Sequence, residues 1–344
     1  MSISTANISV IGFGDLLWDT TFETQSGVIE KFNLAKGNSQ LANDRKIVED
    51  AKKMALENCS SCKETAGGSA SNALKVIARL CDGIVTLCAM VAKDSTGSKA
   101  EKRLNQLGIN LLKVSSADVD QYDGTGIVNS FITREKDGKV ERTMQVFLDI
   151  ATKYYDSCIK PEHFADRKFV ILDGYNIYHD RMLAKCIKLA KENGCKTVMG
   201  LPSPVPVTMF RGHFKKYAGD VDFCFGNREE FEALTTSNDP HTILGQFKPH
   251  QTVVITDGEN GCYVKWSGSD KMRHFKALYV DKVVDTTGAG DFFAGGVMAG
   301  VIAGKTEDAS IQLGLLAASY VIQELGADLP NEKWEEFAKQ AETI

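Results

Sequence analysis

The sequence lacks any uninterrupted apolar stretch near the roughly 20 residues that a membrane-spanning helix needs. Its first residues also lack the basic segment and the long apolar core of a secretory signal peptide. Positive charge is not in excess, because 40 Lys and Arg residues stand against 45 Asp and Glu residues, with the two signs interspersed. We therefore expect a cytoplasmic protein that binds neither a membrane nor a nucleic acid.

Metal-site patterns are also missing. The nine cysteines are scattered over 344 residues, and an odd number in such a long chain favours free thiols in a reducing compartment. Cys59 and Cys62 form a single C-x-x-C pair, and neither a second pair nor a histidine pair has the spacing that zinc requires. We expect free thiols and no zinc site.

Two common nucleotide-binding patterns are incomplete. Gly12 and Gly14 end an apolar strand, but Leu17 stands where a dinucleotide fingerprint needs its third glycine, which disfavours an NAD-linked oxidoreductase. The segment from Gly300 to Thr306 has three residues between its glycines instead of four, and it follows a helix rather than a strand. We expect it to end one helix and begin the next.

The sequence does have the composition of a soluble globular protein, with 43% apolar and 25% charged residues. Strand and helix patterns alternate along much of it, which predicts a doubly wound α/β fold with a mostly parallel sheet and helices on both faces. The expected strands are 84–91, 109–114, 169–172, 197–200, 221–225, 252–255 and 263–266. The expected helices are 44–57, 100–107, 182–192, 228–234 and 309–325.

A second, smaller β region interrupts this alternation. Residues 126–134 and 140–147 alternate as strands, and Asp137-Gly138 between them indicates a hairpin. Residues 20–45, which include the apolar stretch 28–32, indicate short strands and turns. We expect a small β-sheet lid from 20–45 and 109–149, beside a large α/β domain from 1–19, 46–108 and 150–344. Arg142 lies on the lid, where it is either solvated or close enough to reach a phosphate.

The chain is organised around residues 285–291. The β-branched run 280–284 before them predicts a strand, and the apolar run from Phe292 predicts a helix. Gly288, Ala289 and Gly290 then offer free backbone N–H groups at a helix start, which suit a phosphate. Asp291 would repel a phosphate, so we expect it to act as the base that accepts a proton from an attacking hydroxyl. A capped helix start would explain only one or two of these residues.

Polar residues that could bind a hydroxylated acceptor occur at two further places. Asp15 and Asp19 follow the first apolar strand, at the end where open α/β sheets place ligands. A second group opens the helix that follows residue 68, where a plain Ser-capped helix is the alternative. The candidate acceptor-binding residues there are Gly67, Gly68, Ser69 and Asn72.

Two more strand ends carry candidate nucleotide or metal ligands. Asn227 follows a strand and Glu230 comes one helical turn later, an arrangement that can hold a hydrated Mg²⁺. Asn227 could equally be a helix N-cap. Thr256 and Gly258 end the next strand, where they either contact a nucleotide or form a turn.

Together these segments resemble the ribokinase-like (pfkB) carbohydrate kinase family over nearly the whole chain. Residues 285–291 are similar to the family's C-terminal motif, and residues 225–230 resemble its N-x-x-E magnesium motif. Two stretches, G-D-L-L-W-D at 14–19 and A-G-G-S-A-S-N at 66–72, resemble the adenosine kinase branch. The long segment between those two stretches also suits that branch.

The resemblance implies ATP and Mg²⁺ as cofactors and a small nucleoside or sugar as the acceptor. It implies that Asp19, Gly68 and Asn72 hold the ribose hydroxyls. Asp291 would be the general base. Adenosine kinases of this family resemble monomers, so we expect a monomer.

The same resemblance implies how the phosphates are held. Residues 288–290 would form the anion hole, and Arg142 would contact a phosphate from the lid. Asn227 and Glu230 would organise Mg²⁺.

The acceptor's base is left open by the sequence. Asp15 stands where the adenosine kinase branch commonly has asparagine, and Leu16 stands where it has proline. Residues 133–138 and 173–176 are also more polar than an adenine pocket leads us to expect. Adenosine is the first expectation for a purine nucleoside acceptor, with inosine, guanosine, ribose and fructose as alternatives. A catalytically inactive nucleotide- or sugar-binding regulator is a further alternative.

Overall fold

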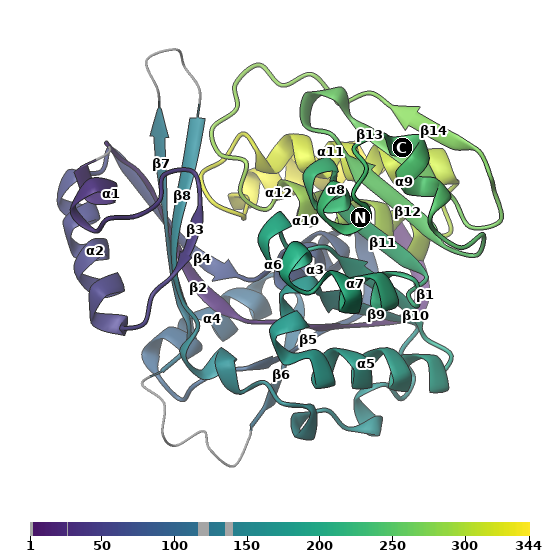
Figure 1. The fold of residues 1–344 in the computed structure, drawn as a ribbon, viewed down its shortest axis with the longest axis horizontal. Coiled ribbons are helices and arrows are strands. Elements are labelled where there is room, and N and C mark those ends of the chain that lie inside the picture. The colour runs from purple at the N-terminus through teal and green to yellow at the C-terminus, as the bar shows by residue number, and fades with distance from the viewer. Residues whose placement is uncertain (1–2, 26, 116–123, 135–139) are drawn as a thin grey trace.

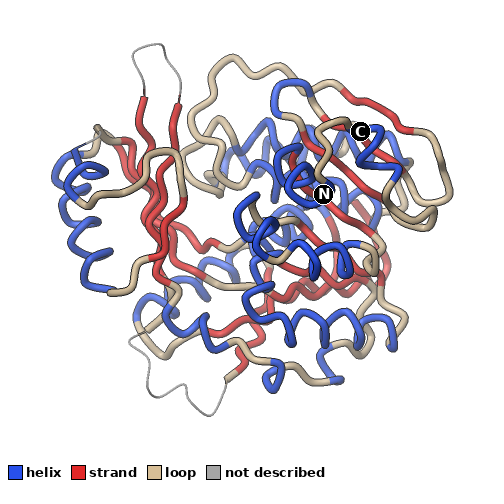
Figure 2. Tube along the Cα trace, in the orientation of Figure 1, coloured by secondary structure: helices blue, strands red, loops and turns tan. Residues whose placement is uncertain are grey.

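Two sheets stand side by side in the computed structural model, which describes residues 3–25, 27–115, 124–134 and 140–344. A nine-stranded sheet has helices on both faces, and a five-stranded sheet stands beside it, at the left of Figure 1. Figure 2 shows the strands of both sheets in red. This architecture confirms the doubly wound α/β fold with a small additional sheet. In the described ranges no helix has the length and apolar character needed to cross a membrane.

The large sheet is parallel except at one edge, where β12, β13 and β14 pair antiparallel. Its first strand lies inside the sheet, third from the β6 edge, between β5 and β9. In order across the sheet, the strands are β14 (Met272–Phe275), β13 (Cys262–Lys265), β12 (Thr252–Thr256), β11 (Phe223–Asn227), β10 (Lys196–Gly200), β9 (Phe169–Asp173), β1 (Ile3–Phe13), β5 (Cys81–Met90) and β6 (Ile109–Val114).

Alternating strand residues point into two separate cores, as expected for a sheet covered on both faces. Val10 belongs to one core and Ile11 to the other, and both side chains are almost fully buried. One face is covered by α3 (Ser69–Leu80), α4 (Ser95–Gln106), α10 (Ala289–Ile302), α11 (Glu307–Val321) and α12 (Asn331–Ala341). The other is covered by α5 (Asp180–Glu192), α6 (Pro204–Met209), α7 (Arg211–Ala218), α8 (Arg228–Thr235) and α9 (Pro240–Gly245).

Short 3-10 helices occupy several connections on the second face and beyond. They are η2 (Asp149–Lys153), η3 (Asp156–Cys158), η4 (Pro161–His163), η5 (Gly174–His179) and η6 (Gly258–Asn260). Between α10 and α11, Thr306 accepts the N–H of Ala309 and caps the second helix, so the glycine-rich stretch before it separates two helices as predicted. All nine cysteines are free thiols, which confirms that expectation.

The small sheet has its own core on the side that faces away from the large sheet. Phe22 and Phe131 stack at its centre with ring centroids 5.7 Å apart, beneath α1 (Gly27–Lys31) and α2 (Arg45–Asn58). The strands across this sheet are β3 (Ser39–Leu41), β8 (Val140–Phe147), β7 (Ile127–Arg134), β2 (Leu17–Glu23) and β4 (Ser61–Gly67). The predicted antiparallel pairing of β7 with β8 is confirmed. The turn predicted at 135–139 lies outside the described residues.

The boundaries of the two parts differ from the sequence expectation. The small sheet begins at Leu17 rather than at residue 20, and it takes in β4, while α2 packs on it. Residues 109–114 form the edge strand β6 of the large sheet and not part of the small one. Residues 109–114 were correctly predicted to form a strand, but periodicity carries no information about which sheet a strand joins. No strand was predicted at β4.

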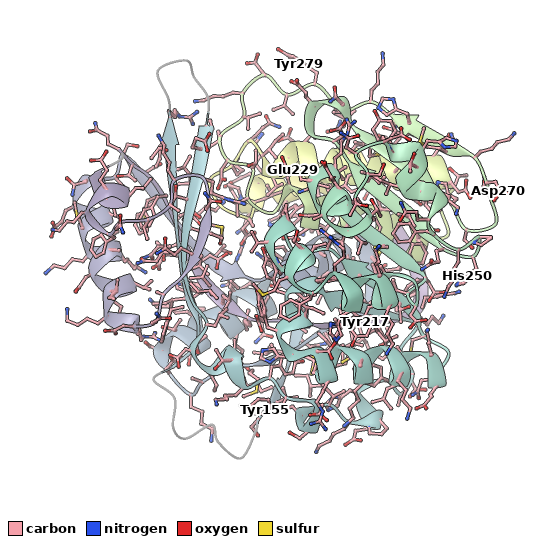
Figure 3. The ribbon with its side chains drawn as sticks, in the orientation of Figure 1. Tyr155, Tyr217, Glu229, His250, Asp270 and Tyr279 are labelled. Atoms are coloured by element: carbon pink, nitrogen blue, oxygen red, sulfur yellow. The ribbon has the colours of Figure 1, made fainter. Side chains whose placement is uncertain are left out.

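Two local predictions are wrong. Residues 28–32 lie in and just after helix α1, where Val28 and Ile29 both pack into the same core of the small sheet. Residues 276–286 form neither strand nor helix. Within them Tyr279 projects into solvent at the top of Figure 3 with 88% of its surface exposed, and Val284 donates its N–H to the Ile322 carbonyl at the end of α11. The expected helix 309–325 accordingly ends at Val321.

Candidate active site

The candidate site forms where the two sheets meet. Residues 14–16 link β1 to β2, and residue 68 links β4 to α3, so two of the connections between the sheets lie here. The C-terminal end of β9 and the N-terminal end of α10 reach the same place, because Asp173 and Asp291 both interact with residues at the start of α3. This position, at the carboxyl ends of parallel strands, is where open α/β sheets bind ligands.

The turn before α10 is held rigidly by Asp285. One of its oxygens, Oδ1, accepts the N–H of Thr287 at 2.9 Å and its hydroxyl at 2.7 Å, and Oδ2 accepts the N–H of Gly326 at 2.9 Å. Gly288 then adopts a left-handed φ of 75°, and a Cβ there would lie 2.6 Å from the Cβ of Ala327. Glycine is therefore required at position 288 for both reasons.

Gly290 is required for neither reason, because a Cβ there would meet no atom within 4 Å. The open space beside it adjoins the first N–H groups of α10, which lack intrahelical partners. Helix starts of this kind bind anions. The structure thus places the predicted anion-binding residues at a helix start with free space next to them.

Asp291, in the first turn of α10, is held by two donors from α3. The Ser69 hydroxyl donates to Oδ1 at 2.6 Å, and Asn72 Nδ2 donates to Oδ2 at 3.0 Å. Burial raises the pKa of Asp291 above its ordinary value, while these two hydrogen bonds and the charges of Lys75 and Arg142 act to lower it. A carboxylate held in this way is orientated to accept a proton.

Arg142 reaches the same turn from the small sheet. Its Nη1 lies 3.4 Å from Oγ1 of Thr287, so the guanidinium of β8 stands beside the start of α10. The sequence placed Arg142 near a phosphate only as one of two alternatives. Its contact with residue 287 favours that alternative over a freely solvated side chain.

Asp19 and Gly67 are brought together by the pairing of β2 with β4. A Cβ on Gly67 would lie 2.1 Å from Oδ2 of Asp19, so only glycine leaves room for that carboxyl. Asp19 is 8% exposed, and its Oδ1 has no hydrogen-bond partner among the described residues. Burial raises its pKa to about 7, with Lys75 opposing the shift and Asp291 adding to it. An orphaned buried acceptor of this kind suits a hydroxyl donor on a ligand.

Asp15 and Gly68 form a second close pair. A Cβ on Gly68, whose φ is 101°, would lie 2.0 Å from the Asp15 carbonyl oxygen. Oδ1 of Asp15 likewise lacks a partner in the described part of the chain. Burial, together with the charge of Asp173, raises the pKa of Asp15 to about 8.

Asp173 is a site residue that the sequence reasoning missed. Its Oδ2 accepts the N–H of Ala70 at 3.3 Å and its Oδ1 accepts that of Tyr175 at 2.9 Å, so it also anchors the start of α3. Burial raises its pKa to about 6, with the charge of Asp291 adding to the shift. The sequence did contain a signal for it. Asp173 comes directly after the expected strand 169–172, just as Asp15 comes after the first apolar strand.

Lys75 is the second missed residue, and it is fully buried on α3 one turn after Asn72. A lysine in the middle of the apolar run 73–77 was the available signal, since lysine is almost never buried without a specific partner.

Asn227 and Glu230 form a capping box at the start of α8. Asn227 Oδ1 accepts the N–H of Glu230 at 2.8 Å, Glu230 Oε2 accepts the N–H of Asn227 at 2.8 Å, and Asn227 Nδ2 donates to Glu230 Oε1 at 2.9 Å. The N-cap alternative is therefore realised. Burial raises the pKa of Glu230 to about 7, partly offset by the Asn227 N–H and increased by the charge of Asp291.

The oxygens of Asn227 and Glu230 are better suited to bind the water ligands of Mg²⁺ than to coordinate the ion directly. Both Glu230 oxygens already accept hydrogen bonds from Asn227. No cluster of three or more His, Cys, Asp or Glu with metal-binding geometry occurs in the described ranges. Mg²⁺ keeps several of its waters in nucleotide sites, so an outer role for this pair remains chemically suitable.

Thr256 lies beside Asn227 at the end of β12, and its hydroxyl donates to the Gly226 carbonyl at 3.4 Å. Gly258 follows with a φ of 53°, and a Cβ on it would meet no atom within 4 Å. The two residues therefore share a sheet edge with the capping box, whereas their contact with a nucleotide stays a prediction.

An acid held beside a glycine-containing helix start, next to buried carboxyls with unpaired oxygens, suits a phosphotransferase that acts on an alcohol. The chain matches the model of the pfkB family carbohydrate kinases over residues 39–334. It belongs to that family. The ribokinase-like fold and the kinase class expected from the sequence are thereby confirmed.

Similar proteins lie in the adenosine kinase branch and among sugar kinases. Adenosine kinase 2 of Arabidopsis thaliana is 25% identical over 351 residues, covering 94% of this chain and 96% of the relative. The crystal structure of a probable sugar kinase from Rhizobium etli superposes with a TM-score of 0.84 at 26% identity, covering 98% and 99% of the two chains. The adenosine kinase of Sinorhizobium meliloti gives a TM-score of 0.82 at 25% identity, covering 98% and 100%.

Proposed function

We propose that the chain transfers the γ-phosphoryl group of ATP to the 5′-hydroxyl of a purine ribonucleoside, with adenosine as the first candidate. The observation that carries this proposal is the double hydrogen bond from Ser69 and Asn72 to Asp291 at the start of α10. It supports a base role because it fixes the carboxylate next to amides that suit a phosphate. The adenosine kinases among the relatives support the choice of acceptor.

In the proposed reaction, Asp291 accepts the hydroxyl proton as the acceptor oxygen bonds to phosphorus and ADP leaves. The N–H groups of residues 288–290 stabilise charge on the phosphoryl oxygens, and Arg142 adds a positive charge from the small sheet. Magnesium, when bound with ATP, supplies further charge neutralisation at the phosphates. Asn227 and Glu230 would hold it through water.

The acceptor would be held by the buried acids at the meeting of the sheets. Asp19 offers an orphaned oxygen to the ribose hydroxyls, beside Gly67 and Gly68. We infer that the five-stranded sheet acts as a lid over this site and excludes water, which otherwise competes as the acceptor. The chain is expected to work as a monomer.

A second candidate is a sugar kinase of the same family. It is favoured by Asp15 and Asp173, which add buried polar carboxyl groups to the site where a purine pocket would be more apolar. It is also consistent with the structural neighbour named as a probable sugar kinase. Inosine and guanosine, with more polar bases than adenosine, fall between the two candidates.

A coupled ADP-release assay with MgATP against adenosine, inosine, guanosine, cytidine, ribose and fructose tests the proposal. We expect turnover on a purine nucleoside far above that on either sugar. Turnover on sugars alone would overturn the nucleoside proposal while leaving the phosphotransferase class intact. ATP binding without turnover on any acceptor would favour an inactive regulator instead.

A further inference from the structure

Lys75 makes three hydrogen bonds although none of its surface is exposed. Its Nζ donates to the Ala66 carbonyl at 2.6 Å, to Asn72 Oδ1 at 2.9 Å and to the Ala327 carbonyl at 2.7 Å. An ammonium group has three N–H donors and no acceptor, so this set uses its full capacity. A neutral amine could not make all three bonds, which indicates that Lys75 carries its charge here.

Each acceptor belongs to a different part of the candidate site. Ala66 lies near the end of β4, directly before Gly67, which makes room for Asp19. Ala327 packs against the backbone of Gly288, because a Cβ on that glycine would lie 2.6 Å from its side chain. Lys75 therefore joins the acceptor side and the anion side of the site through one buried nitrogen.

The third acceptor, Asn72, is also the donor to Asp291. An asparagine amide has one oxygen and one NH₂ group, and a half-turn about its last bond exchanges them. The Lys75 ammonium can only donate hydrogen bonds, so Asn72 must turn its Oδ1 toward it. The Nδ2 of Asn72 then points to Asp291. In the opposite orientation, the amide oxygen would confront the carboxylate and its NH₂ would confront the ammonium.

We propose that Lys75 is a positioning residue that fixes the amide of Asn72 so that it donates to Asp291 and holds this base ready for proton transfer. The proposal rests on the phosphotransfer role proposed for Asp291. It goes beyond that role, because it assigns a mechanistic task to a residue that has no exposed surface.

The charges around this unit set the direction of its pH dependence. Five charged or titratable groups from different elements surround Asp291. The two cations are Lys75 from α3 and Arg142 from β8. The three acids are Asp19 from β2, Asp173 from β9 and Glu230 from α8. Loss of the Lys75 charge and of the Asn72 donation both favour the protonated form of Asp291. The acid limb of a kcat profile that requires its carboxylate should then move to higher pH.

Lys75 is itself part of a wider charged cluster, which supplies a matched control. Although burial alone would raise the pKa of Asp328, the charges of Lys75 and Arg103 hold it well below its usual range. Arg103 Nε bonds Asp328 Oδ2 at 2.7 Å, and its Nη2 donates to the Leu329 carbonyl at 3.4 Å, so its hydrogen bonds are directed to residues other than Asn72 and Asp291. Arg103→Met therefore removes a cation from the same cluster without disturbing the amide.

The test compares Lys75→Met, Arg103→Met and the wild type by kcat over pH 5–9, on whichever acceptor the wild type turns over. For Lys75→Met we expect a kcat about tenfold or more lower at neutral pH and an acid limb about one pH unit higher. For Arg103→Met we expect the acid limb to stay at the wild-type pH, even if its melting temperature falls as much as that of Lys75→Met. Equal profiles for the two variants would overturn the proposal.

A double-mutant cycle with Asn72→Ala tests whether Lys75 acts through the amide. If it does, Lys75→Met costs less than about twofold in kcat once Asn72 is alanine. An equal cost in both backgrounds would overturn the proposal. If Lys75→Met does not fold, Lys75→Gln, which retains one donor group but no charge, is held to the same two criteria. Absence of wild-type turnover on any acceptor would instead be a failure of the proposed function.

Discussion

Asn72 and Asp291 are hydrogen-bonded at 3.0 Å although 219 residues separate them in the chain. The bond joins the first turn of α3 to the first turn of α10, and these two helices pack on the same face of the large sheet. Neither helix start alone would distinguish a catalytic acid from a capping residue. Their meeting favours the catalytic role, because an amide and a hydroxyl from one helix hold a single carboxylate on the other.

Replacement of this carboxylate by its amide tests its role as the base. Asp291→Asn should lower kcat by about 10²–10⁴-fold with little change in KM, since it removes the proton acceptor and preserves the shape of the side chain. Steady-state kinetics with both substrates measures this. A variant with near wild-type kcat would rule out Asp291 as the base.

The two glycines that flank Ala289 should respond in opposite ways to alanine. Gly288→Ala introduces a Cβ at a φ of 75° and 2.6 Å from Ala327, so we expect a loss of about 1–3 kcal/mol in the free energy of unfolding. Gly290→Ala meets no atom within 4 Å and removes a flexible residue from a helix, so its stability should be unchanged or higher.

For Gly290→Ala, we expect the effect on catalysis to differ from the effect on stability. We expect Gly290→Ala to lower kcat/KM for ATP in spite of its intact stability, because its methyl group enters the open space beside the first N–H groups of α10. Denaturant titration gives the stabilities, and initial rates give kcat/KM. Full activity in a stable Gly290→Ala variant would show that phosphate does not approach this residue.

Stability should depend on pH through the buried acids. The pKa of Asp15 is raised from 3.8 to about 8 in the folded chain, so the folded state binds this proton more tightly than the unfolded state does. Its stabilising contribution is complete below about pH 4 and is lost as the pH rises through about 8. Asp15→Asn cannot ionise, so its melting temperature should exceed that of the wild type by about 2 °C or more at pH 8.

The control for this comparison is Asp270→Asn, on an exposed turn at the right of Figure 3. Its melting temperature should follow the wild type at every pH. Thermal melts from pH 5 to 8 provide both curves. If Asp15→Asn melts below the wild type at pH 8, the carboxyl is not held against ionisation as its burial implies.

Variants of two adjacent glutamates on α8 can distinguish a role in Mg²⁺ binding from a general effect of surface charge. Glu230 is 8% exposed beside Asn227, whereas Glu229 is exposed to solvent (Figure 3). Glu230→Gln should raise the Mg²⁺ concentration for half-maximal rate by about tenfold, as expected for an outer-sphere partner. Glu229→Gln should leave it unchanged. Equal Mg²⁺ dependence in both variants would remove Glu230 from the metal site.

Local chemistry allowed much of this site to be predicted from the sequence. The glycines at 288 and 290, the acid that follows them, and the polar start of α3 are each visible within a few residues of chain. Asp19 was predicted because strand ends share one edge of a parallel sheet. Such inferences need only the order of elements, which hydrophobic periodicity supplies well.

Long-range contacts were beyond reach. The lysine at 75 becomes meaningful only when Ala66 and Ala327 are known to lie on either side of it. The β-branched run at 280–284 predicted a strand, but among the described residues no neighbouring strand pairs with it, and the segment bonds to the end of α11 instead. Propensity describes what a segment can form, and tertiary partners decide what it does form.

The polypeptide first passes from the large sheet to the small one through three residues, between Phe13 and Leu17, and it first returns through Gly68. These two crossings touch, since the Asp15 carbonyl oxygen would be 2.0 Å from a Cβ at position 68. This part of the joint between the sheets is thus built from residues proposed to bind the acceptor. A bound acceptor would therefore brace this connection between the sheets. Acceptor affinity and the rigidity of the connection then depend on the same residues, so that a substitution which weakens one also weakens the other.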